Sequence, residues 1–406
     1  MNEIQQLFTK SKSHLNTLCS EITERCVGSE GNRKATEFFR NELTRLGWET
    51  ESQEFEAIDW KESGATLKVE DQDFRVYVSP YSMGCSAQTP LATVKNIHEL
   101  ETGNFESKII LLYSDIAKEQ LMPKNFVFYN PESHQKIVSL LERTGAKAII
   151  CATGRNAALA GGVYPFPLIE DGDFDIPSVY MTEEEGEKLL KYSGSIVNLN
   201  SVSERFPGKG YNVIGRKGKP GQERIVITAH IDAKKGSPGA IDNATGVTVL
   251  LLLAELLKDY SGDKMIEIVA FNGEDYYAVP GQMTWIIANQ DKFDNICLNI
   301  NIDGVGYKEG KSSFSFFDLP DNIQKVADKL VKDNPELLEG PQWPQGDHSI
   351  FLQYGVPAIA VTSQWFLENI EKQDITHTPK DNLSIVSEEK TVTVALILKQ
   401  LIEQLS

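Results

Sequence analysis

Hydrophobic positions along the second half of the chain fall into short unbroken runs that alternate with longer segments of helical spacing. Strands are predicted over 223–230, 264–271, 295–302 and 356–363, and helices over 243–260 and 387–405. Nearly continuous apolar strands alternating with helices are typical of a largely parallel sheet covered on both faces. We therefore predict an α/β fold with a doubly wound, mostly parallel sheet.

The first half of the chain has a different pattern of hydrophobic and polar residues. Residues 31–47 have the apolar spacing of a helix that ends at Gly47, and the alternation over 48–57 predicts a strand. From about 60 to 205, strand-like runs and helical pieces follow one another without any dense grouping of His, Asp and Glu. Because 406 residues favour two domains, we predict one domain from 1–60 plus 206–406 and a β-rich domain inserted at 61–205.

The composition limits the classes of binding partner and the cellular compartment that we expect for this protein. The net charge of -18 disfavours nucleic acids and anionic membranes, whereas carboxylates suit divalent cations. The sequence has no apolar run of the roughly 20 residues that a membrane helix needs, and the N-terminus has no apolar secretory segment. The five cysteines form no C-x-x-C pair, which predicts free thiols in a reducing cytoplasm. We therefore expect a cytoplasmic protein without membrane or nucleic-acid partners.

Histidines and carboxylates recur at the ends of the predicted strands. Such loops gather at one edge of an open α/β sheet. Carboxylates brought together there would repel one another unless cations compensate them, and imidazole and carboxylate groups are standard zinc ligands. The sequence therefore predicts a two-metal site at this edge. The residues that occupy these loops are His230, Asp232, Asp242, Glu274, Asp275, Asp303 and His377.

Two of these residues are interpreted as partners of the metal ligands. His230 and Asp232 are two positions apart on an extended segment and can face the same way, so Asp232 is expected to accept the second ring N–H of His230. Glu274 and Asp275 are adjacent and cannot easily reach one atom together. We assign Asp275 to the metal and Glu274 to proton transfer, first as general base and then as general acid.

Each residue alone has a simpler interpretation. A histidine at a strand end is usually an ordinary polar residue, and Asp242 before a helix fits an N-cap. The joint pattern at successive strand ends favours the metal site. His348 is expected beside the site without binding metal. The sequence has no H-E-x-x-H and no G-x-S-x-G, which excludes the helical zinc-protease and the serine α/β-hydrolase designs.

The motifs that carry these residues resemble those of a known family. They are AHIDAKKGSPGAIDNATG, AFNGED, NIDGVG, GDHSIF and THTPKDN, together with the N-terminal GSEGNRKATEFFRNELTRLG. In combination they are similar to the co-catalytic di-zinc aminopeptidases, metallopeptidase family 28, which also includes glutamate carboxypeptidase II, the transferrin receptor and the glutaminyl cyclases. The resemblance covers nearly the whole chain, and residues 61–205 resemble the protease-associated domain that some members carry.

The resemblance implies a fold of the zinc-exopeptidase type and a role for each ligand. Asp242 would bridge two zinc ions, with Asp275 and His377 completing one site and His230 and Asp303 the other. A water held between the metals would attack the scissile carbonyl, while the metals polarise it and bind the free amine. Co2+ or Mn2+ also suit such ligands.

The sequence departs from the family pattern at two positions. Asp275 stands where many members have Glu, and its shorter side chain can still coordinate. Thr376 stands where several relatives have a Tyr that helps the oxyanion, which leaves more of the transition-state stabilisation to the metals. Trp365 and Phe366 either wall an apolar side-chain pocket or pack in the core.

Three functions of this site are distinguished. An aminopeptidase that uses Glu274 to activate the water and removes the N-terminal residue of a peptide is the favoured one. A di- or carboxypeptidase on the same site would need a cation for a substrate carboxylate, and Lys234 and Lys235 either provide it or balance local acids. A non-catalytic binding protein of this fold should lack ligands, and a glutaminyl cyclase would use one metal. The preferred residue and the oligomeric state stay open.

Overall fold

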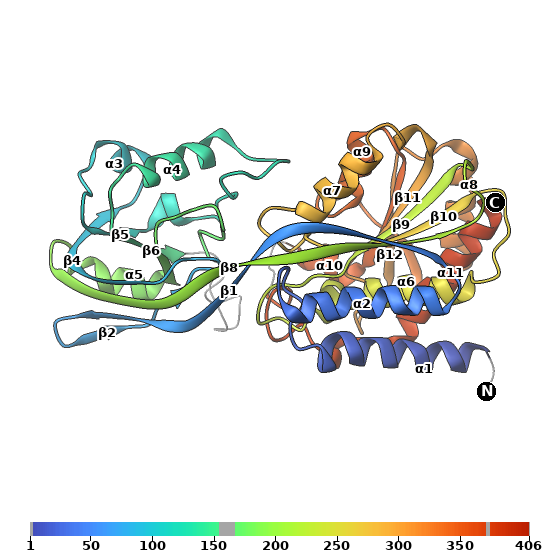
Figure 1. Cartoon of the computed structure of the whole chain (residues 1–406), viewed down its shortest axis with the longest axis horizontal. Helices are drawn as coiled ribbons and strands as arrows, with labels where there is room; N and C mark the ends of the chain where they lie inside the picture. Colours follow the sequence, from blue (N-terminus) through green and yellow to red (C-terminus); the bar gives the residue numbers. More distant parts are fainter. Residues whose placement is uncertain (1–2, 154–166, 371–373, 406) are drawn as a thin grey trace. The chain divides into compact units, whose positions relative to one another are not determined.

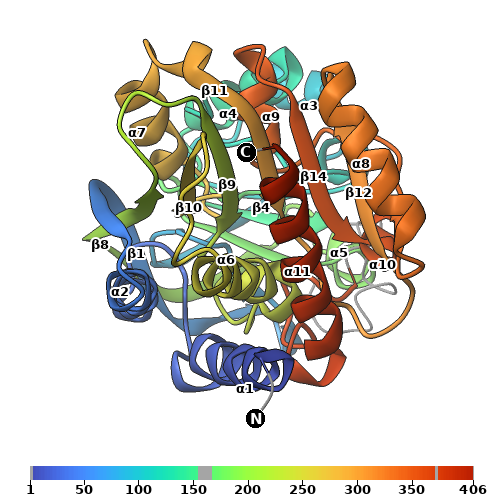
Figure 2. The same ribbon diagram turned by 90° about the vertical axis from the view of Figure 1, so that its right-hand side faces the viewer.

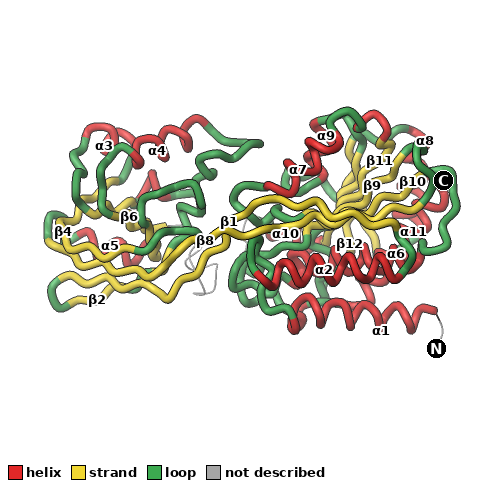
Figure 3. The backbone as a smooth tube through the Cα atoms, in the orientation of Figure 1, coloured by secondary structure: helices red, strands yellow, loops and turns green. Residues whose placement is uncertain are grey.

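The chain forms two compact units. The computed structural model describes residues 3–153, 167–370 and 374–405. One unit, here called the α/β unit, consists of the described residues of 1–57 and 208–406, and the inserted unit consists of those of 58–207. Two long strands, β1 (Glu49–Val69) and β8 (Ile196–Lys217), carry the chain from one unit to the other (Figure 1, Figure 3).

A largely parallel sheet forms the centre of the α/β unit. Its strand order is β13 (Leu337–Glu339), β12 (Ser312–Phe317), β14 (Ala358–Ser363), β11 (Ile296–Ile302), β9 (Arg224–His230), β10 (Met265–Phe271) and the C-terminal part of β8, which β1 also pairs. Strands β14, β11, β9 and β10 run parallel, whereas β12 and β8 are antiparallel to their neighbours. The predicted mostly parallel sheet is confirmed, and the four predicted strands are its parallel centre.

Helices cover both faces of this sheet, as the doubly wound prediction requires. Helices α6 (Thr245–Leu256) and α11 (Glu388–Leu405) lie against one face, with α1 (Glu3–Asn16), α2 (Glu30–Arg45) and α8 (Asp321–Asp333) packed beside them (Figure 2). Helices α7 (Pro280–Asn289) and α9 (His348–Gln353) lie on the other face, where Trp285 contacts Phe271 and Phe351. The remaining short elements are α10 (Gln364–Asn369) and the turns η1 (Thr17–Glu21), η3 (Ala240–Ala244), η4 (Phe293–Asn295) and η5 (Leu383–Ile385).

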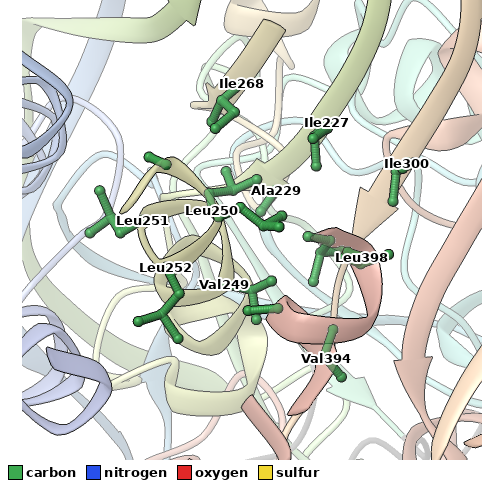
Figure 4. Packing of buried hydrophobic residues seen from close by; sticks show 14 of the residues in the cluster. Ile227, Ala229, Val249, Leu250, Leu251, Leu252, Ile268, Ile300, Val394 and Leu398 are labelled. Atoms are coloured by element: carbon green, nitrogen blue, oxygen red, sulfur yellow. The ribbon is translucent and has the colours of Figure 1, made fainter. Parts of the chain in front are cut away.

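Helix α6 is apolar on every side because it is surrounded. Val249, Leu250 and Leu252 are all fully buried, and they share one cluster with residues of β9, β10, β11 and α11 (Figure 4). On β9, Ile227 and Ala229 point into this cluster, as the two-residue period of a strand dictates. Full burial of one such side chain contributes about 1.5–3 kcal/mol. The cluster therefore gives the strand ends a rigid base.

Helix α2 begins and ends at the residues that its sequence indicates. Ser29 has extended backbone geometry, and its hydroxyl accepts a hydrogen bond from the main-chain N–H of Asn32 at 3.0 Å. Gly47 follows the helix with φ 73°, a left-handed conformation that glycine adopts without a steric penalty. The helix ends at Arg45 with Leu46 as its C-cap, and Gly47, which the sequence predicts as the cap, is the residue after it.

The inserted unit is rich in strands and has its own core. Its sheet runs through the N-terminal part of β8, then β4 (Cys85–Val94), β5 (Ile109–Leu112), β6 (Ala148–Thr153), β7 (Ser178–Thr182) and β3 (Tyr77–Val78), while β2 (Gln72–Phe74) pairs with β1. Strands β4 to β7 are parallel, and two hydrophobic clusters lie within the unit. Its helical elements are α3 (Ile97–Thr102), α4 (Glu132–Glu142), α5 (Glu183–Leu190) and η2 (Ser114–Ala117).

Two expectations about composition can be compared with the fold. Among the described residues, no helix combines the length and the apolar character that crossing a membrane requires. All five cysteines are free thiols, as the sequence predicts. Burial raises the pKa of the Cys151 thiol above its usual range, so this cysteine acts as a small apolar core residue.

Shortening a side chain of α6 tests how much the sheet depends on this helix. We expect Leu250→Ala to lower the free energy of unfolding by about 2–5 kcal/mol, because the cavity left in a fully buried cluster cannot collapse. Ile287→Ala on α7, where the side chain is 63% exposed, should change it by no more than about 0.5 kcal/mol. Denaturant unfolding of both variants gives the comparison, and equal losses would contradict the central role of α6.

Candidate metal centre

The order of the strands brings the predicted residues to one edge of the sheet. The chain goes from β9 to β10 on one side and then returns to β11 on the other side of β9. Strand order reverses at β9, and such a reversal opens a crevice beyond the carboxyl ends of the strands. The loops that follow β9, β10, β11 and β14 all end at this crevice, and they carry the predicted histidines and carboxylates.

His230, Asp242 and Asp303 form the first group of side chains. His230 is the last residue of β9, and Asp303 directly follows β11. The Nε2 atom of His230 lies 3.0 Å from Oδ1 of Asp242 and 3.6 Å from Oδ1 of Asp303. All three residues are buried. These groups come from three separate segments, so only the folded sheet unites them.

His377, Asp275 and the same Asp242 form the second group. The Nε2 atom of His377 lies 3.1 Å from Oδ2 of Asp242 and 3.0 Å from Oδ1 of Asp275. His377 has φ 63°, a conformation uncommon for residues other than glycine and frequent at functional sites. Asp242 therefore turns one carboxylate oxygen to each histidine and lies between the two groups.

The N-cap interpretation of Asp242 does not describe its contacts. The N-cap of α6 is Ala244, and the neighbouring Asn243 accepts a hydrogen bond with its side-chain oxygen from the main-chain N–H of Gly246 at 3.0 Å. The amide of Asn243 also donates to the carbonyl of Ile302 at 2.8 Å, next to Asp303. The peptide bond between Asp242 and Asn243 is cis. The carboxylate of Asp242 is directed at the two histidines.

The donor set fits divalent metal ions. In each of the two groups, the nitrogen and carboxylate oxygens lie within 4.8 Å of one another. Ligands about 2.0–2.2 Å from a tetrahedral zinc ion lie roughly 3.3–3.6 Å apart, close to the separations measured here. Within the described residues, Oδ2 of Asp275 is buried without a hydrogen-bond partner, and Nε2 of His230 is buried with carboxylates as its close neighbours. Buried polar atoms without partners are costly unless a ligand satisfies them.

The pKa shifts of the two histidines also indicate that the site needs cations. Burial opposes protonation of His230, but the carboxylates of Asp303, Asp232 and Asp242 outweigh it and raise the pKa of His230 well above its usual range. His377 behaves likewise, because Asp275 and Asp242 overcome burial and raise its pKa. Both imidazoles are therefore protonated in the metal-free protein. Their positive charges balance the carboxylates in the place of metal ions.

A tight turn after β10 presents Glu274 and Asp275. Gly273 has φ 134°, which side chains rarely allow. The carboxylate of Asp232 accepts main-chain hydrogen bonds from Gly273 at 2.8 Å, from Glu274 at 3.3 Å and from Asp275 at 3.0 Å. Asp232 therefore holds the turn that carries two site residues.

The contact of Asp232 with His230 differs in detail from the expectation. The ring nitrogen Nδ1 of His230 lies 3.2 Å from the main-chain carbonyl of Asp232, whereas the carboxylate is 3.7 Å away. The carboxylate is occupied by the turn, which was not foreseeable from the two-residue spacing. The same residue thus orients His230 through its main chain and the turn through its side chain.

Glu274 is half-buried at the rim of the two groups. Its burial raises the pKa of Glu274 well above the usual range, and the charges of Asp275, Asp303 and Asp347 add to the shift. A carboxylate with a raised pKa is a stronger base near neutral pH. Asp275 belongs to a metal-compatible group and the adjacent Glu274 does not, which fits the division of roles expected from the sequence.

The sequence analysis assigned no role to two buried carboxylates beside the site, Asp347 and Asp381, although both belong to the quoted motifs. Asp347 accepts a hydrogen bond from the amide of Gln282 at 2.9 Å, and burial raises the pKa of Asp347 to about 7. Asp381 accepts from the main-chain N–H groups of Ile241 and Asp242 at 2.7 and 3.0 Å. Their short distance in sequence from His348 and His377 was the available signal.

His348 lies in the core. Its Nε2 atom is 2.9 Å from the carbonyl of Trp343, and its ring packs against Phe317 and Trp343. Burial lowers the pKa of His348 to about 4, which keeps the imidazole neutral. It is not among the two metal-compatible groups, so its contacts fit a structural role.

The aromatic residues after β14 divide between the two interpretations given to them. Trp365 stacks on Tyr307 with ring centroids 4.3 Å apart, in a small apolar cluster that also contains Ile241, the neighbour of Asp242. Phe366 instead packs against Trp343 in a cluster with residues of β12 and β14. Trp365 therefore lies in the cluster next to Asp242, and the ring of Phe366 lies against Gly304, the neighbour of Asp303.

The loop after β9 also carries two lysines. Lys235 lies 3.5 Å from the carboxylate of Glu24, and neither Lys234 nor Lys235 is without an interaction partner. Thr376, at the position where relatives have a Tyr, is buried. These contacts favour charge balance as the role of Lys235.

Comparisons with known proteins find aminopeptidases among the similar proteins. Among curated proteins, the aminopeptidase YwaD of Bacillus subtilis (strain 168) is 24% identical over 414 residues, which cover 96% of this chain and 83% of the relative. The probable leucine aminopeptidase 2 of Aspergillus oryzae is 20% identical and covers 82% of this chain and 68% of that protein.

Solved structures show the same fold. An aminopeptidase from Aneurinibacillus sp. strain AM-1 superimposes with a TM-score of 0.76 at 22% identity, covering 98% of this chain and 93% of the other. BSAP, a zinc aminopeptidase from Bacillus subtilis, gives a TM-score of 0.74 at 20% identity, with 98% and 94% covered. Residues 212–402 match the model of Peptidase family M28, and this range contains His230, Asp242, Glu274, Asp303 and His377. These residues therefore carry a domain of Peptidase family M28.

Proposed function

We propose that this chain is a zinc-dependent aminopeptidase that hydrolyses the N-terminal residue of peptides. The observation that carries the proposal is the position of Asp242, whose two oxygens lie 3.0 and 3.1 Å from the Nε2 atoms of His230 and His377. A carboxylate shared by two metal-compatible groups is the arrangement that a two-metal site requires. The domain of Peptidase family M28 and the relatives named as aminopeptidases support the reaction class.

The metal ligands are assigned by the two groups. His230 and Asp303 would hold one zinc ion, His377 and Asp275 the other, and Asp242 both. Two bound zinc ions supply Lewis-acid chemistry, which lowers the pKa of water and polarises a carbonyl group. The same ligands suit Co2+ or Mn2+. The loop ends on β9, β10, β11 and β14 would keep these ligands in place with little reorganisation.

Glu274 is the proposed proton carrier. It would take the proton of the attacking water and deliver it to the amine that leaves. Its raised pKa suits both steps near neutral pH, because the carboxylate is basic enough to accept a proton and acidic enough to release it. Asp232 acts as a positioning residue through the main-chain N–H groups of the turn from Gly273 to Asp275.

The alternatives of the sequence analysis receive less support. A carboxypeptidase needs a cation ready for a substrate carboxylate, whereas Lys235 is 3.5 Å from Glu24. A binding protein without catalysis should have lost ligands, yet all five are present beside Glu274. The inserted unit is proposed to be a protease-associated-like domain, on the basis of its strands and its place between the two segments of the α/β unit. The five free thiols fit the proposed cytoplasmic location.

Turnover of free and blocked peptides tests the reaction. The wild-type protein with zinc should release the first residue from peptides with a free amine and leave amine-blocked peptides intact. Glu274→Gln should reduce kcat by roughly 10²- to 10⁴-fold, because the amide cannot accept the proton, while zinc content stays unchanged. Cleavage of blocked peptides from their other end would establish a carboxypeptidase instead. Two bound zinc ions without any turnover would support a binding protein.

Zinc binding should release protons at neutral pH. His230 and His377 have raised pKa values, so both imidazoles carry protons in the zinc-free protein at pH 7. Zinc requires neutral imidazoles, and its apparent affinity should therefore increase with pH as these protons become easier to remove. Calorimetric titration in two buffers of different ionisation enthalpy measures the number of protons released. A heat of binding that is the same in both buffers would contradict these protonation states.

The apolar cluster beside Asp242 predicts a preference for large apolar N-terminal residues. We expect Trp365→Ala to reduce the ratio of kcat/KM for leucine over alanine substrates by roughly tenfold, the effect of losing apolar contacts in a specificity pocket. Tyr354→Ala, which removes an aromatic side chain stacked on Phe293, is the matched control and should leave the ratio unchanged. An unchanged ratio in Trp365→Ala would assign Trp365 to core packing.

A further inference from the structure

The loop that carries His377 also holds the loop that carries Asp242. Asp381 lies four residues after His377 and is fully buried. One of its carboxylate oxygens accepts a hydrogen bond from the N–H of Ile241 at 2.7 Å, and the other accepts from the N–H of Asp242 at 3.0 Å. Its main-chain carbonyl accepts from the N–H of Ala240 at 3.2 Å. Asp381 thus accepts hydrogen bonds from three consecutive main-chain N–H groups, the last of which belongs to Asp242 itself.

A further contact fixes the same two loops. The hydroxyl of Ser237 donates to the carbonyl of Thr378 at 3.1 Å and accepts from the N–H of Gly239 at 3.1 Å. Residues 237–242 are therefore attached to residues 378–381 at both ends of the segment. Because His377 directly precedes this second segment, the attachment determines the distance between His377 and Asp242.

The opposite side of the Asp242 loop is held by Arg25. Its guanidinium group is buried and donates to the carbonyls of Pro238 at 2.7 Å and of Gly239 at 2.8 Å. The same group binds the carbonyls of Leu18 and Ile231. Arg25 thus fixes the start of the loop to the body of the unit, and the side chain of Asp381 fixes its end to the His377 loop.

Asp242 keeps a separate link to the other group of ligands. The side chain of Asn243 donates to the carbonyl of Ile302, the residue before Asp303. His230 and Asp303 stand at the ends of β9 and β11, which are paired strands. If the carboxylate of Asp381 were lost, Asp242 would keep its link to the group of His230 and Asp303, whereas its own N–H and that of Ile241 would lose their attachment to the His377 loop.

We propose that Asp381 is a positioning residue that joins the Asp242 and His377 loops, so that its carboxylate selectively maintains the metal group of Asp242, Asp275 and His377. This inference rests on the proposed function, since it requires that this group binds zinc. The two oxygens of a carboxylate can accept both N–H groups at once, whereas an asparagine offers one acceptor oxygen and an alanine none. Residues that orient metal ligands typically change metal affinity by about 10- to 100-fold when they are replaced.

Zinc titration of the full chain with a competing chelator tests the proposal. The wild-type protein should bind two equivalents. Asp381→Ala should retain one equivalent with nearly unchanged affinity and bind the second about 10- to 100-fold more weakly. Asp381→Asn should bind the second equivalent with intermediate affinity, because its one oxygen can accept one of the two N–H groups. This graded series also serves if the alanine variant does not fold.

Asp171→Ala is the matched control in the inserted unit. Asp171 is buried, and its carboxylate likewise accepts two main-chain hydrogen bonds, from Lys124 at 2.7 Å and from Asp173 at 2.8 Å. Its removal should leave both zinc affinities unchanged. Thermal unfolding of the zinc-free variants shows that each is folded.

The outcomes separate this inference from the proposed function. Two equivalents bound by Asp381→Ala with wild-type affinities would overturn the inference, and so would equal weakening of both equivalents, which indicates general damage. If the wild-type protein bound no zinc, the proposed function would fail, whatever the variants did. Selective loss of the second equivalent, graded from Asp to Asn to Ala, would support the inference.

Discussion

The concentration of negative charge at one edge of the sheet is the constraint on which the site depends. Asp242, Asp275 and Asp303 are buried together, with Glu274 beside them. Carboxylates at such distances cannot all remain charged without cations, and in the described residues the nearest positive groups are the two imidazoles. The site is therefore complete only when something positive balances it. Divalent metal ions meet this need with the ligand types that are present.

The α/β sheet makes this unfavourable arrangement stable. His230 ends β9 and Asp303 directly follows β11, and the cluster around α6 fixes these strands (Figure 4). Asp275 lies in the turn after β10, while Asp242 lies in η3 and His377 lies beyond α10. The helices on the two faces leave the carboxyl ends of the strands free for loops (Figure 2). Repulsion among a few carboxylates is small beside the burial of so large an apolar cluster. The energy of the core thus holds groups together that would otherwise separate.

A second set of polar residues converts this approximate placement into a defined geometry. Asp232 and Asp381 use their carboxylates to accept main-chain N–H groups of ligand-bearing loops. Arg25 does the reverse, since it donates to main-chain carbonyls of the Asp242 loop. These side chains act on the backbone of the loops, where a shift of one residue would move a ligand out of range. They fix the positions of the ligand-bearing loops and do not contact the reacting groups themselves.

Much of the fold was predictable because its signals are local. The apolar runs of β9, β10, β11 and β14 and the helical spacing of α2, α6 and α11 record which side chains are buried. A His or a carboxylate at successive strand ends identified the candidate site residues, since parallel strands place those ends at one edge. The antiparallel strand β12 and helix α8 had no part in that prediction, although both complete the sheet and its cover.

The tertiary structure decided what depends on contacts between distant segments. Sequence spacing suggested that the carboxylate of Asp232 serves His230, but the turn from Gly273 to Asp275 occupies it, more than forty positions along the chain. His348 resembled a site residue and is enclosed by Trp343 and Phe317 in the core. Asp381 received no role in the sequence analysis, yet its carboxylate accepts a hydrogen bond from the main-chain N–H of Asp242. The sequence by itself determined which elements form and which residue types stand at their ends, because those depend on local spacing and burial. Only the tertiary structure decided which of these polar groups face one another, because hydrogen bonds and ion pairs require atoms within about 3–4 Å that the chain brings together from remote positions.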